Sequence, residues 1–402
     1  MKQILQNRKA LLIRMGAYDM TQAISRAAAT LQEMGYDITI LSMDIHNNKS
    51  DEEEVNGWKI LWYHHQYKSG NKLSFLWAWL CWWIWVIRHI RNGKYDLVQA
   101  SNLESIVPCV LAKYTKNFPL VLDVRDPWGM VGSNSKSLMM RIFKGLECRA
   151  AARVDGIVLS QGLVDRIGIY FGKKVRRNIP VVQVLNVPGK DMADDYYPPN
   201  LDQIRVNFSG HISYVRNAQA FIDLAKSKPE VQIDIIGEVR DLKLKEALKS
   251  LSNVKIYGRV SFDESMKLLS QANIIAVTYD SSTEVAIVSS ANKMFEAMMM
   301  SRPYLGSKGA YPGLIAEKYD VGWAIPYGDS QALINLISDL QENPKQIEEK
   351  AQRARKVYIE NFTWEKQKTN LTVMYRYVMG DIHINFSKCA GWSKLLGSFQ
   401  SV

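Results

Sequence analysis

The chain has 402 residues, 47% of them hydrophobic, which is enough sequence for two domains of ordinary size. Charged residues make up 23% and aromatic residues 10%, with only 12 prolines, and these values exclude a mainly disordered, collagen-like or low-complexity chain. Lys and Arg total 51 against 40 for Asp and Glu, so the formal net charge is +11. Such an excess predicts an anionic partner: nucleic acid, a membrane surface or a phosphorylated substrate.

Two local features of the sequence bear on the cellular compartment of the protein. The cysteines, Cys81, Cys109, Cys148 and Cys389, are widely spaced and form no CxxC pair, which suits a reducing compartment and indicates no zinc site. The N-terminal residues contain only a short apolar stretch and no small-residue cleavage site, so no signal peptide is expected.

The first half of the chain alternates strand and helix patterns. Buried strands are predicted at 10–15, 37–43, 95–100, 120–124, 155–160 and 181–187, with helices at 21–34, 103–114 and 137–153. Alternation of this kind predicts a parallel sheet covered by helices on both faces.

Residues 75–87 form an unbroken apolar run that holds five of the 11 tryptophans. As a helix the run is about 20 Å long, short of the hydrocarbon core of about 30 Å, so no transmembrane span is expected. Lys72 precedes it and Arg88, Arg91 and Lys94 follow it. Because Trp favours the membrane interface and cations attract anionic headgroups, the helix is either buried core or part core and part membrane-seated.

Residues 189–199 break the pattern with acidic residues, tyrosines and a Pro-Pro pair, and are predicted to be a linker. The alternation then restarts, with strands at 204–210, 231–237, 254–260, 273–280 and 302–307 and helices at 217–228, 241–250, 263–271, 291–300, 330–341 and 344–360. The sequence therefore predicts an α/β protein with two Rossmann-like domains. Their predicted bounds are 1–188 and 200–363, followed by a helix at 364–380 that returns to the first domain and a tail at 381–402.

The first strand of the second domain ends at Gly210, and a helix begins soon after Arg216. A glycine at this position lets a ligand approach the backbone, and the following helix start offers free N–H groups. The planar donor fork of an Arg suits a diphosphate. The alternative for this element is an ordinary strand-to-helix turn.

A second element opens a helix with small residues, Ser289 to Asn292, which leave its first N–H groups uncovered as an anion site. Lys293 adds a positive charge, and Glu296, one turn later, has the position to accept hydrogen bonds from two ribose hydroxyls. The alternatives are an ordinary helix cap for the serines and a solvated helix residue for Glu296.

Together these motifs resemble the retaining nucleotide-sugar glycosyltransferases of the GT-B fold, especially glycosyltransferase family four and a subgroup of it that builds surface polysaccharides. The resemblance covers roughly residues 10–378, with the motifs in the family's order. The matching segments are Gly210 with Arg216 six residues on, Ile235 to Gly237, Tyr257 to Val260, Asn292 to Pro303 and Val124 to Trp128. It implies two Rossmann-like domains that face each other across a cleft.

The resemblance also implies roles for the matching residues. The positions it assigns to the donor are Gly16, Gly210, His211, Gly237, Arg259, Val260, Ser290, Ala291, Asn292 and Glu296. Among them, the backbone of Arg259 and Val260 holds the nucleobase and Glu296 holds the ribose. Arg216, where the family has Lys, and Lys293 stabilise the charge that grows on the leaving diphosphate.

Several positions depart from the family's pattern or carry alternatives. His211 replaces an Arg and is a weaker cation, and Val288 stands where many members have a Glu, with Glu284 nearby. Arg125 and Asp126 occupy the place of a His-Asp pair that faces the sugar, so they are assigned to donor-sugar or acceptor contacts. The alternatives are a salt bridge for Arg125 and a turn former for Asp126.

The resemblance implies transfer of a hexose-type sugar from a nucleoside-diphosphate-sugar donor to an acceptor hydroxyl, with retention and without a cofactor. No metal is expected, because no DxD motif follows a strand and Asp194-Asp195 lie in the linker. The basic charge and the Trp77–Trp85 region favour an anionic membrane surface at its cytoplasmic face and a lipid-linked or cell-surface glycan acceptor. Nucleic acid is the least expected partner, because the tryptophans cluster in one apolar run.

Two alternatives stay open. One is a non-catalytic, degenerate GT-B protein that binds membranes, which the departures at His211 and Val288 favour. The other is a nucleotide-sugar 2-epimerase, which needs acidic and His residues gathered at the cleft. The sequence has six histidines and no such cluster.

Overall fold

The computed structural model describes residues 8–18, 22–66, 72–128, 130, 138–172, 175, 179–189, 191–193 and 198–383. The chain divides into two compact units. One comprises residues through Val184 together with those from Gln367 on, and the other comprises Leu185–Lys366.

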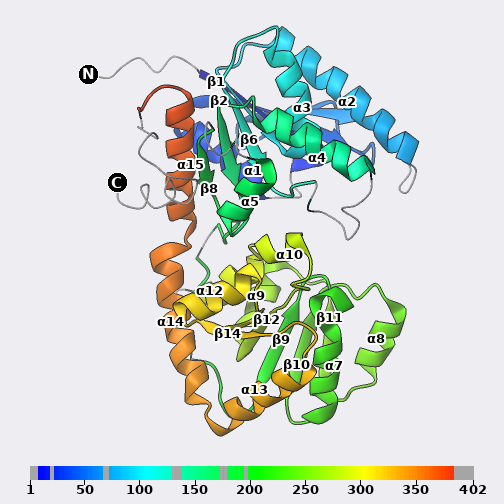
Figure 1. The fold of residues 1–402 in the computed structure, drawn as a ribbon, viewed down its shortest axis with the longest axis vertical. Coiled ribbons are helices and arrows are strands. Elements are labelled where there is room, and N and C mark those ends of the chain that lie inside the picture. Colours follow the sequence, from blue (N-terminus) through cyan, green and yellow to red (C-terminus); the bar gives the residue numbers. More distant parts are fainter. Residues whose placement is uncertain are drawn as a thin grey trace. The chain divides into compact units, whose positions relative to one another are not determined.

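The first unit is built on an eight-stranded sheet in the order β3-β4-β2-β1-β5-β6-β7-β8 (Figure 1). Neighbouring strands are parallel except at one edge, where β3 and β4 form an antiparallel hairpin. The strands are β1 (Arg8–Arg14), β2 (Tyr36–Asp44), β3 (Glu52–Val55), β4 (Trp58–His64), β5 (Leu97–Ser101), β6 (Leu120–Val124), β7 (Gly156–Leu159) and β8 (Val181–Gln183). The central strands β5, β6 and β7 are buried throughout, as expected for a sheet covered on both faces.

The β3–β4 hairpin is not among the elements predicted from the sequence. Asn56 and Gly57 connect its strands with φ angles of 56° and 77°, the left-handed values that a two-residue hairpin turn requires. An Asn-Gly pair between the acidic run of β3 and the alternating pattern of β4 was the signal that could have predicted it.

The helices of the first unit are α1 (Gln22–Glu33), α2 (Lys72–Asn92), α3 (Asn102–Lys113), α4 (Leu138–Ala151), α5 (Val164–Phe171) and most of α15 (Trp364–Val378). The last of these is the C-terminal helix. Its Tyr375 hydroxyl donates to Gln99 Oε1 at 2.6 Å, and its Lys368 pairs with Glu33 of α1. These contacts attach the chain's last helix to the first unit.

The second unit has a six-stranded parallel sheet in the order β11-β10-β9-β12-β13-β14 (Figure 1). The strands are β9 (Arg205–Ser209), β10 (Gln232–Ile236), β11 (Val254–Gly258), β12 (Ile274–Val277), β13 (Tyr304–Ser307) and β14 (Gly322–Ile325). The helices are α7 (Ala218–Ser227), α8 (Leu242–Lys249), α9 (Phe262–Ser270), α10 (Glu284–Val288), α11 (Asn292–Met299), α12 (Tyr311–Tyr319), α13 (Ser330–Glu342) and α14 (Lys345–Asn361), with a 3₁₀ turn, η2 (Tyr214–Arg216), after β9.

Apolar side chains of the strands and helices form the core of the second unit. Phe208 of β9 stacks on Phe221 of α7 with ring centroids 4.7 Å apart, and both are almost fully buried. The predicted α/β class with two Rossmann-like units is confirmed. The carboxyl ends of the parallel strands in each unit meet at one sheet edge, where ligands bind in folds of this class.

Candidate functional site

Three neighbouring strands of the second unit end in glycines with positive φ. The angles are 105° at Gly210 after β9, 131° at Gly237 after β10 and 73° at Gly258, which ends β11. The Gly210 amide donates to the Ile236 carbonyl at 2.8 Å, and the Gly237 amide donates to the Gly258 carbonyl at 2.7 Å. A Cβ on Gly237 would lie 2.0 Å from the Gly210 oxygen, whereas one on Gly210 or Gly258 would meet nothing within 4 Å. The edge is therefore closely packed at Gly237 and open at Gly210 and Gly258.

Arg216 ends the η2 turn beside this edge. Its Cζ lies 3.8 Å from the centroid of the Tyr279 ring, a cation–π contact, and its carbonyl accepts a hydrogen bond from Thr278 Oγ1 at 2.7 Å. Within the described part of the chain, no ion pair of Arg216 is found. Stacking therefore holds the guanidinium in place while its charge stays uncompensated, as a diphosphate ligand requires.

The start of α11 is a second anion-binding feature. Ala291 is its N-cap residue, without a side-chain cap hydrogen bond, so the alternative of a serine cap is wrong. Ser290 precedes the cap, and Asn292, the first helical residue, accepts a hydrogen bond from Asn186 Nδ2 at 3.0 Å. The N-cap side chain therefore offers no acceptor to the first N–H groups of α11, which carry the helix's partial positive charge.

Glu296 is only 7% exposed, so the alternative of a solvated helix residue is wrong. Lys293 Nζ lies 2.6 Å from Glu296 Oε2 and 3.4 Å from Ser265 Oγ of α9. The ion pair orients the carboxylate and compensates the lysine charge. The geometry therefore suits Glu296 as a hydrogen-bond acceptor for hydroxyls, while a diphosphate role for Lys293 stays a prediction.

The other predicted donor contacts differ in burial. His211 is exposed directly after Gly210. The Arg259 side chain is also exposed and pairs with Glu238 at 2.8 Å, while Val260 is half-buried. Their roles in binding the donor stay predictions, which for Arg259 and Val260 concern the backbone.

Val288, at the family's Glu position, is fully buried at the end of α10. An apolar side chain in the core offers no hydrogen bond to a sugar. Glu284 begins the same helix and is exposed.

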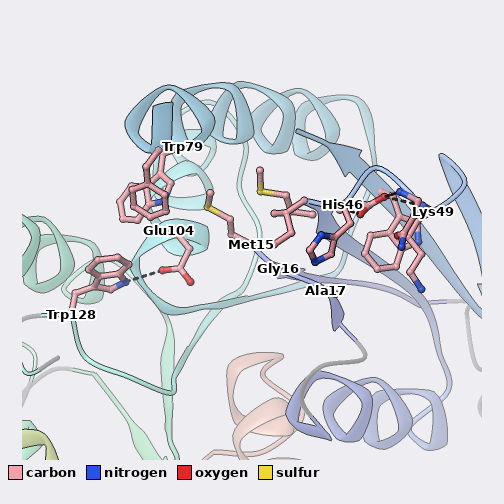
Figure 2. Close-up of a pocket in the computed structure, with 14 residues that line it drawn as sticks. Met15, Gly16, Ala17, His46, Lys49, Trp79, Glu104 and Trp128 are labelled. Carbon is pink, nitrogen blue, oxygen red and sulfur yellow. Dashed lines mark hydrogen bonds between the residues drawn. The ribbon is translucent and has the colours of Figure 1, made fainter. Parts of the chain in front are cut away.

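The first unit contains a cavity of about 330 Å³ between α2 and the loop after β1 (Figure 2). Gly16, the predicted first-domain contact of the donor, lines it with a φ of 138°, and its carbonyl accepts a hydrogen bond from Ser42 Oγ at 2.8 Å. Aromatic side chains and two carboxyls also line it, namely Trp62, Phe75, Trp79, Trp128, Asp44 and Glu104. Its volume lies at the lower end of the range of about 300–1,000 Å³ for small-molecule sites.

Two carboxyls hold Trp128 at this cavity, that of half-buried Glu104 and that of buried Glu147. The indole Nε1 donates to Glu104 Oε2 at 2.9 Å, and the backbone amide donates to Glu147 Oε2 at 3.2 Å (Figure 2 shows the first bond). Tyr170 also donates to Glu147. Burial raises the pKa of Glu104, and it raises the pKa of Glu147 to about 8. The sequence predicts neither residue for the site, because a Glu within a helix pattern is indistinguishable from a solvated helix residue.

Arg125 forms the salt bridge that the sequence left open as an alternative. Its Nε lies 2.9 Å from the buried carboxylate of Asp123, and its amide donates to Asn102 Oδ1 at 2.8 Å. Asp126 is exposed, but partial desolvation raises its pKa. The positive charges of Arg125 and Arg14 act in the opposite direction and have the smaller effect. Neither Arg125 nor Asp126 lines the cavity, and their assignment to sugar contacts stays a prediction.

The tryptophan-rich helix α2 is mainly a core helix. Trp79 and Trp82 are 4% and 0% exposed, and Trp83 donates to the Glu104 carbonyl at 3.0 Å, whereas Trp77 is 61% exposed. The Trp77–Trp85 region as a whole is therefore not available to a membrane. Its exposed apolar residues are Leu76, Trp77, Leu80 and Ile84. Among the described helices, none has both the length and the hydropathy of a membrane span.

The Asp194-Asp195 pair lies outside the described residues. Within the described ranges, His, Cys, Asp and Glu side chains form no group of three or more that could hold a metal ion.

Residues 206–343 match the model of the family described as glycosyl transferases group 1. This match includes the glycine edge, Arg216 and α11. No curated protein sequence matches the chain.

Several solved structures have a similar fold. Sucrose-phosphate synthase from Thermosynechococcus elongatus is 14% identical, with a TM-score of 0.70 over 93% of this chain and 100% of the other. HepE of Anabaena in complex with UDP is 15% identical, with a TM-score of 0.66 and the same coverage. The lipopolysaccharide outer core galactosyltransferase WaaB is 14% identical, with a TM-score of 0.63, again over 93% and 100%.

At these identities the structures establish the fold, and it is that of the GT-B glycosyltransferases. The fold alone does not select the reaction, because a putative UDP-N-acetylglucosamine 2-epimerase from Listeria monocytogenes shares it. The family match of the second unit supports sugar transfer.

Proposed function

We propose that the protein transfers a hexose-type sugar from a nucleoside-diphosphate sugar to an acceptor hydroxyl, with retention at the anomeric carbon. One observation carries the proposal: the open glycine edge, the uncompensated Arg216 and the start of α11, whose N-cap is an alanine, occur together within residues 206–343, the segment that matches a glycosyltransferase family. The complex of the similarly folded HepE with UDP supports a nucleotide-linked donor.

The chemistry follows from where charge develops. As the bond from the sugar to the diphosphate breaks, negative charge grows on the leaving group, and Arg216 with the α11 N–H groups stabilises it. Glu296 accepts hydrogen bonds from the ribose hydroxyls and fixes the donor's orientation. In a retaining reaction the leaving diphosphate itself helps to take the acceptor proton, so no strong dedicated base is required.

Nucleotide binding tests the proposal directly. We expect one nucleoside diphosphate from a panel that includes UDP and GDP to raise the melting temperature, since a ligand at 100 times its Kd adds about 2.7 kcal/mol of stability. Glu296→Ala should abolish this shift, because it removes the acceptor for the ribose hydroxyls. Glu264→Ala, which removes an exposed carboxylate on α9, is the matched control and should keep the full shift.

Silence across the whole panel would contradict the proposal. Nucleotide binding without sugar transfer to any acceptor would instead favour the non-catalytic, degenerate GT-B protein. Conversion of the donor sugar without an acceptor would favour the epimerase. Each alternative therefore has its own readout in the same screen.

We further propose that the acceptor is a lipid-linked or cell-surface glycan and that the protein is cytoplasmic and peripheral on the inner membrane face. The exposed apolar residues of α2 support this, because basic Arg88 and Arg91 are exposed on the same helix. On α4, exposed Leu138 and Ile142 accompany exposed Arg141. Apolar side chains mixed with cations suit an anionic lipid surface. The lipopolysaccharide galactosyltransferase among the similar structures also supports a glycan acceptor.

Flotation with vesicles that contain anionic lipid tests the membrane contact. Trp77→Ala should weaken binding at least tenfold, because removing an interfacial Trp costs more than about 1.4 kcal/mol. Leu242→Ala removes a side chain that is 73% exposed on α8 of the second unit and is the matched control. Equal binding of wild type and Trp77→Ala to the vesicles would show that Trp77 of α2 does not contribute to the membrane contact.

A further inference from the structure

The cavity of the first unit combines aromatic walls with two carboxyls, those of Asp44 and Glu104. Asp44 already accepts hydrogen bonds from the backbone amides of residues 46–49, whereas Glu104 is half-buried at the other end. Trp62, Phe75 and Trp79 contribute apolar surface. Figure 2 shows Glu104 and Trp128 at one end of the cavity and His46 and Lys49 at the other. The mechanism proposed for the donor uses none of these side chains. Among the residues that line the cavity, only Gly16 is a predicted donor contact.

We propose that this cavity binds an uncharged sugar ring of the acceptor, with a ring hydroxyl hydrogen-bonded to Glu104. The inference rests on the proposed function, and it adds the class of acceptor group and the residue that recognises it. A sugar ring has apolar C–H faces and a polar hydroxyl edge, which matches aromatic walls with the Glu104 carboxyl at one end of the cavity. The volume of about 330 Å³ suits one or two rings rather than a long hydrocarbon tail.

The Glu104 carboxyl is held in one orientation. Trp128 Nε1 donates to its Oε2 at 2.9 Å, and Glu147 fixes the Trp128 backbone through a second hydrogen bond. The next residue, Ser105, accepts a hydrogen bond from the Met15 amide at 3.1 Å, which joins the start of α3 to the loop that carries Gly16. A carboxyl fixed in this way loses little entropy when it binds a hydroxyl.

The charges decide against an anionic group beside Glu104. An ionised carboxyl would repel a phosphate, and a protonated one would offer a single donor in an apolar environment. Arg14 is the cation that acts on Glu104, where its charge opposes the effect of burial on the carboxyl pKa, whereas Lys49 and His46 lie away from Glu104 (Figure 2). The Glu104 end therefore suits a neutral hydroxyl.

Binding of simple neutral sugars to the full chain provides the test, and it needs no donor. Methyl glycosides of glucose, galactose and mannose are titrated against the tryptophan fluorescence of the protein. We expect at least one to bind the wild type and to bind at least tenfold more weakly to Glu104→Ala. Glu104→Gln keeps a hydrogen-bonding group and the Trp128 anchor, and should recover most of the affinity.

Two controls distinguish a direct contact between Glu104 and the sugar from a purely structural role of Glu104. Glu147→Ala also removes an anchor of Trp128, but Glu147 does not line the cavity, so this variant should lose clearly less affinity than Glu104→Ala. Deoxy analogues of the bound glycoside should show one hydroxyl whose removal weakens binding to the wild type but not to Glu104→Ala.

Three results would overturn the inference. The first is that no glycoside binds, and the second is that Glu147→Ala loses as much affinity as Glu104→Ala. The third is that removing any sugar hydroxyl weakens binding to Glu104→Ala as much as it weakens binding to the wild type. Failure of the nucleotide screen with intact glycoside binding would instead contradict the proposed function alone.

Discussion

Arg216→Ala should lower kcat/KM for sugar transfer by about 100-fold to 1,000-fold, the usual cost of removing one group that stabilises a developing anion. The guanidinium is stacked 3.8 Å from the Tyr279 ring centroid, and no ion pair of Arg216 occurs in the described part of the chain. It is therefore positioned before the donor binds, and its charge is available for the leaving diphosphate. Steady-state kinetics with the donor found in the nucleotide screen measures the effect.

Two variants sharpen this prediction. Arg216→Lys keeps the charge but loses the planar stack and the donor fork, so we expect an intermediate loss. Arg240→Ala removes an exposed arginine that pairs with Glu238 at 3.0 Å, and transfer should be unchanged. If Arg216→Ala retained wild-type kcat/KM, Arg216 would have no part in stabilising the leaving group.

Gly237→Ala should destabilise the second unit by about 3 kcal/mol or more, the range of strained backbone combined with overpacking. Its φ of 131° disfavours any L side chain, and an added Cβ would lie 2.0 Å from the Gly210 carbonyl oxygen. That oxygen belongs to the backbone, so relief requires movement of the β9 or β10 strand end. Chemical denaturation followed by circular dichroism measures the loss of unfolding free energy.

Gly258→Ala is the matched control on the neighbouring strand. Its φ of 73° is also left-handed, but an added Cβ would meet nothing within 4 Å. It should therefore cost only the conformational penalty of about 1–2 kcal/mol. Equal destabilisation by the two variants would show that the close approach of Gly237 to Gly210 does not constrain the sheet edge.

The α/β class and most strands and helices were predictable because they depend on local patterns. Strand runs such as that of β12 are apolar throughout, and helices such as α7 repeat apolar residues at helical spacing. The hairpin β3–β4 was missed because its acidic first strand lacks an apolar pattern, although Asn56-Gly57 marked its turn.

In the second unit, the order of short motifs identified Gly210, Arg216 and Glu296 as candidates, because each motif occupies a strand end or a helix start whose chemistry is local. What these side chains contact depends on other elements. The stack of Arg216 on Tyr279 joins η2 to the segment after β12, and the pairing of Lys293 with Glu296 decides which of the two keeps an available charge.

The sequence by itself determined the class of fold and the motif order and predicted an anionic partner, because these depend on composition and on residues close in the chain. Only the tertiary structure decided which face of α2 is covered, since a helix that is apolar all round has no periodicity from which to choose a face. It also decided that Glu104 meets Trp128 at a cavity wall, because that contact joins α3 to the segment after β6. The +11 charge indicated what kind of partner to expect, and packing determined which side chains remain free to meet it.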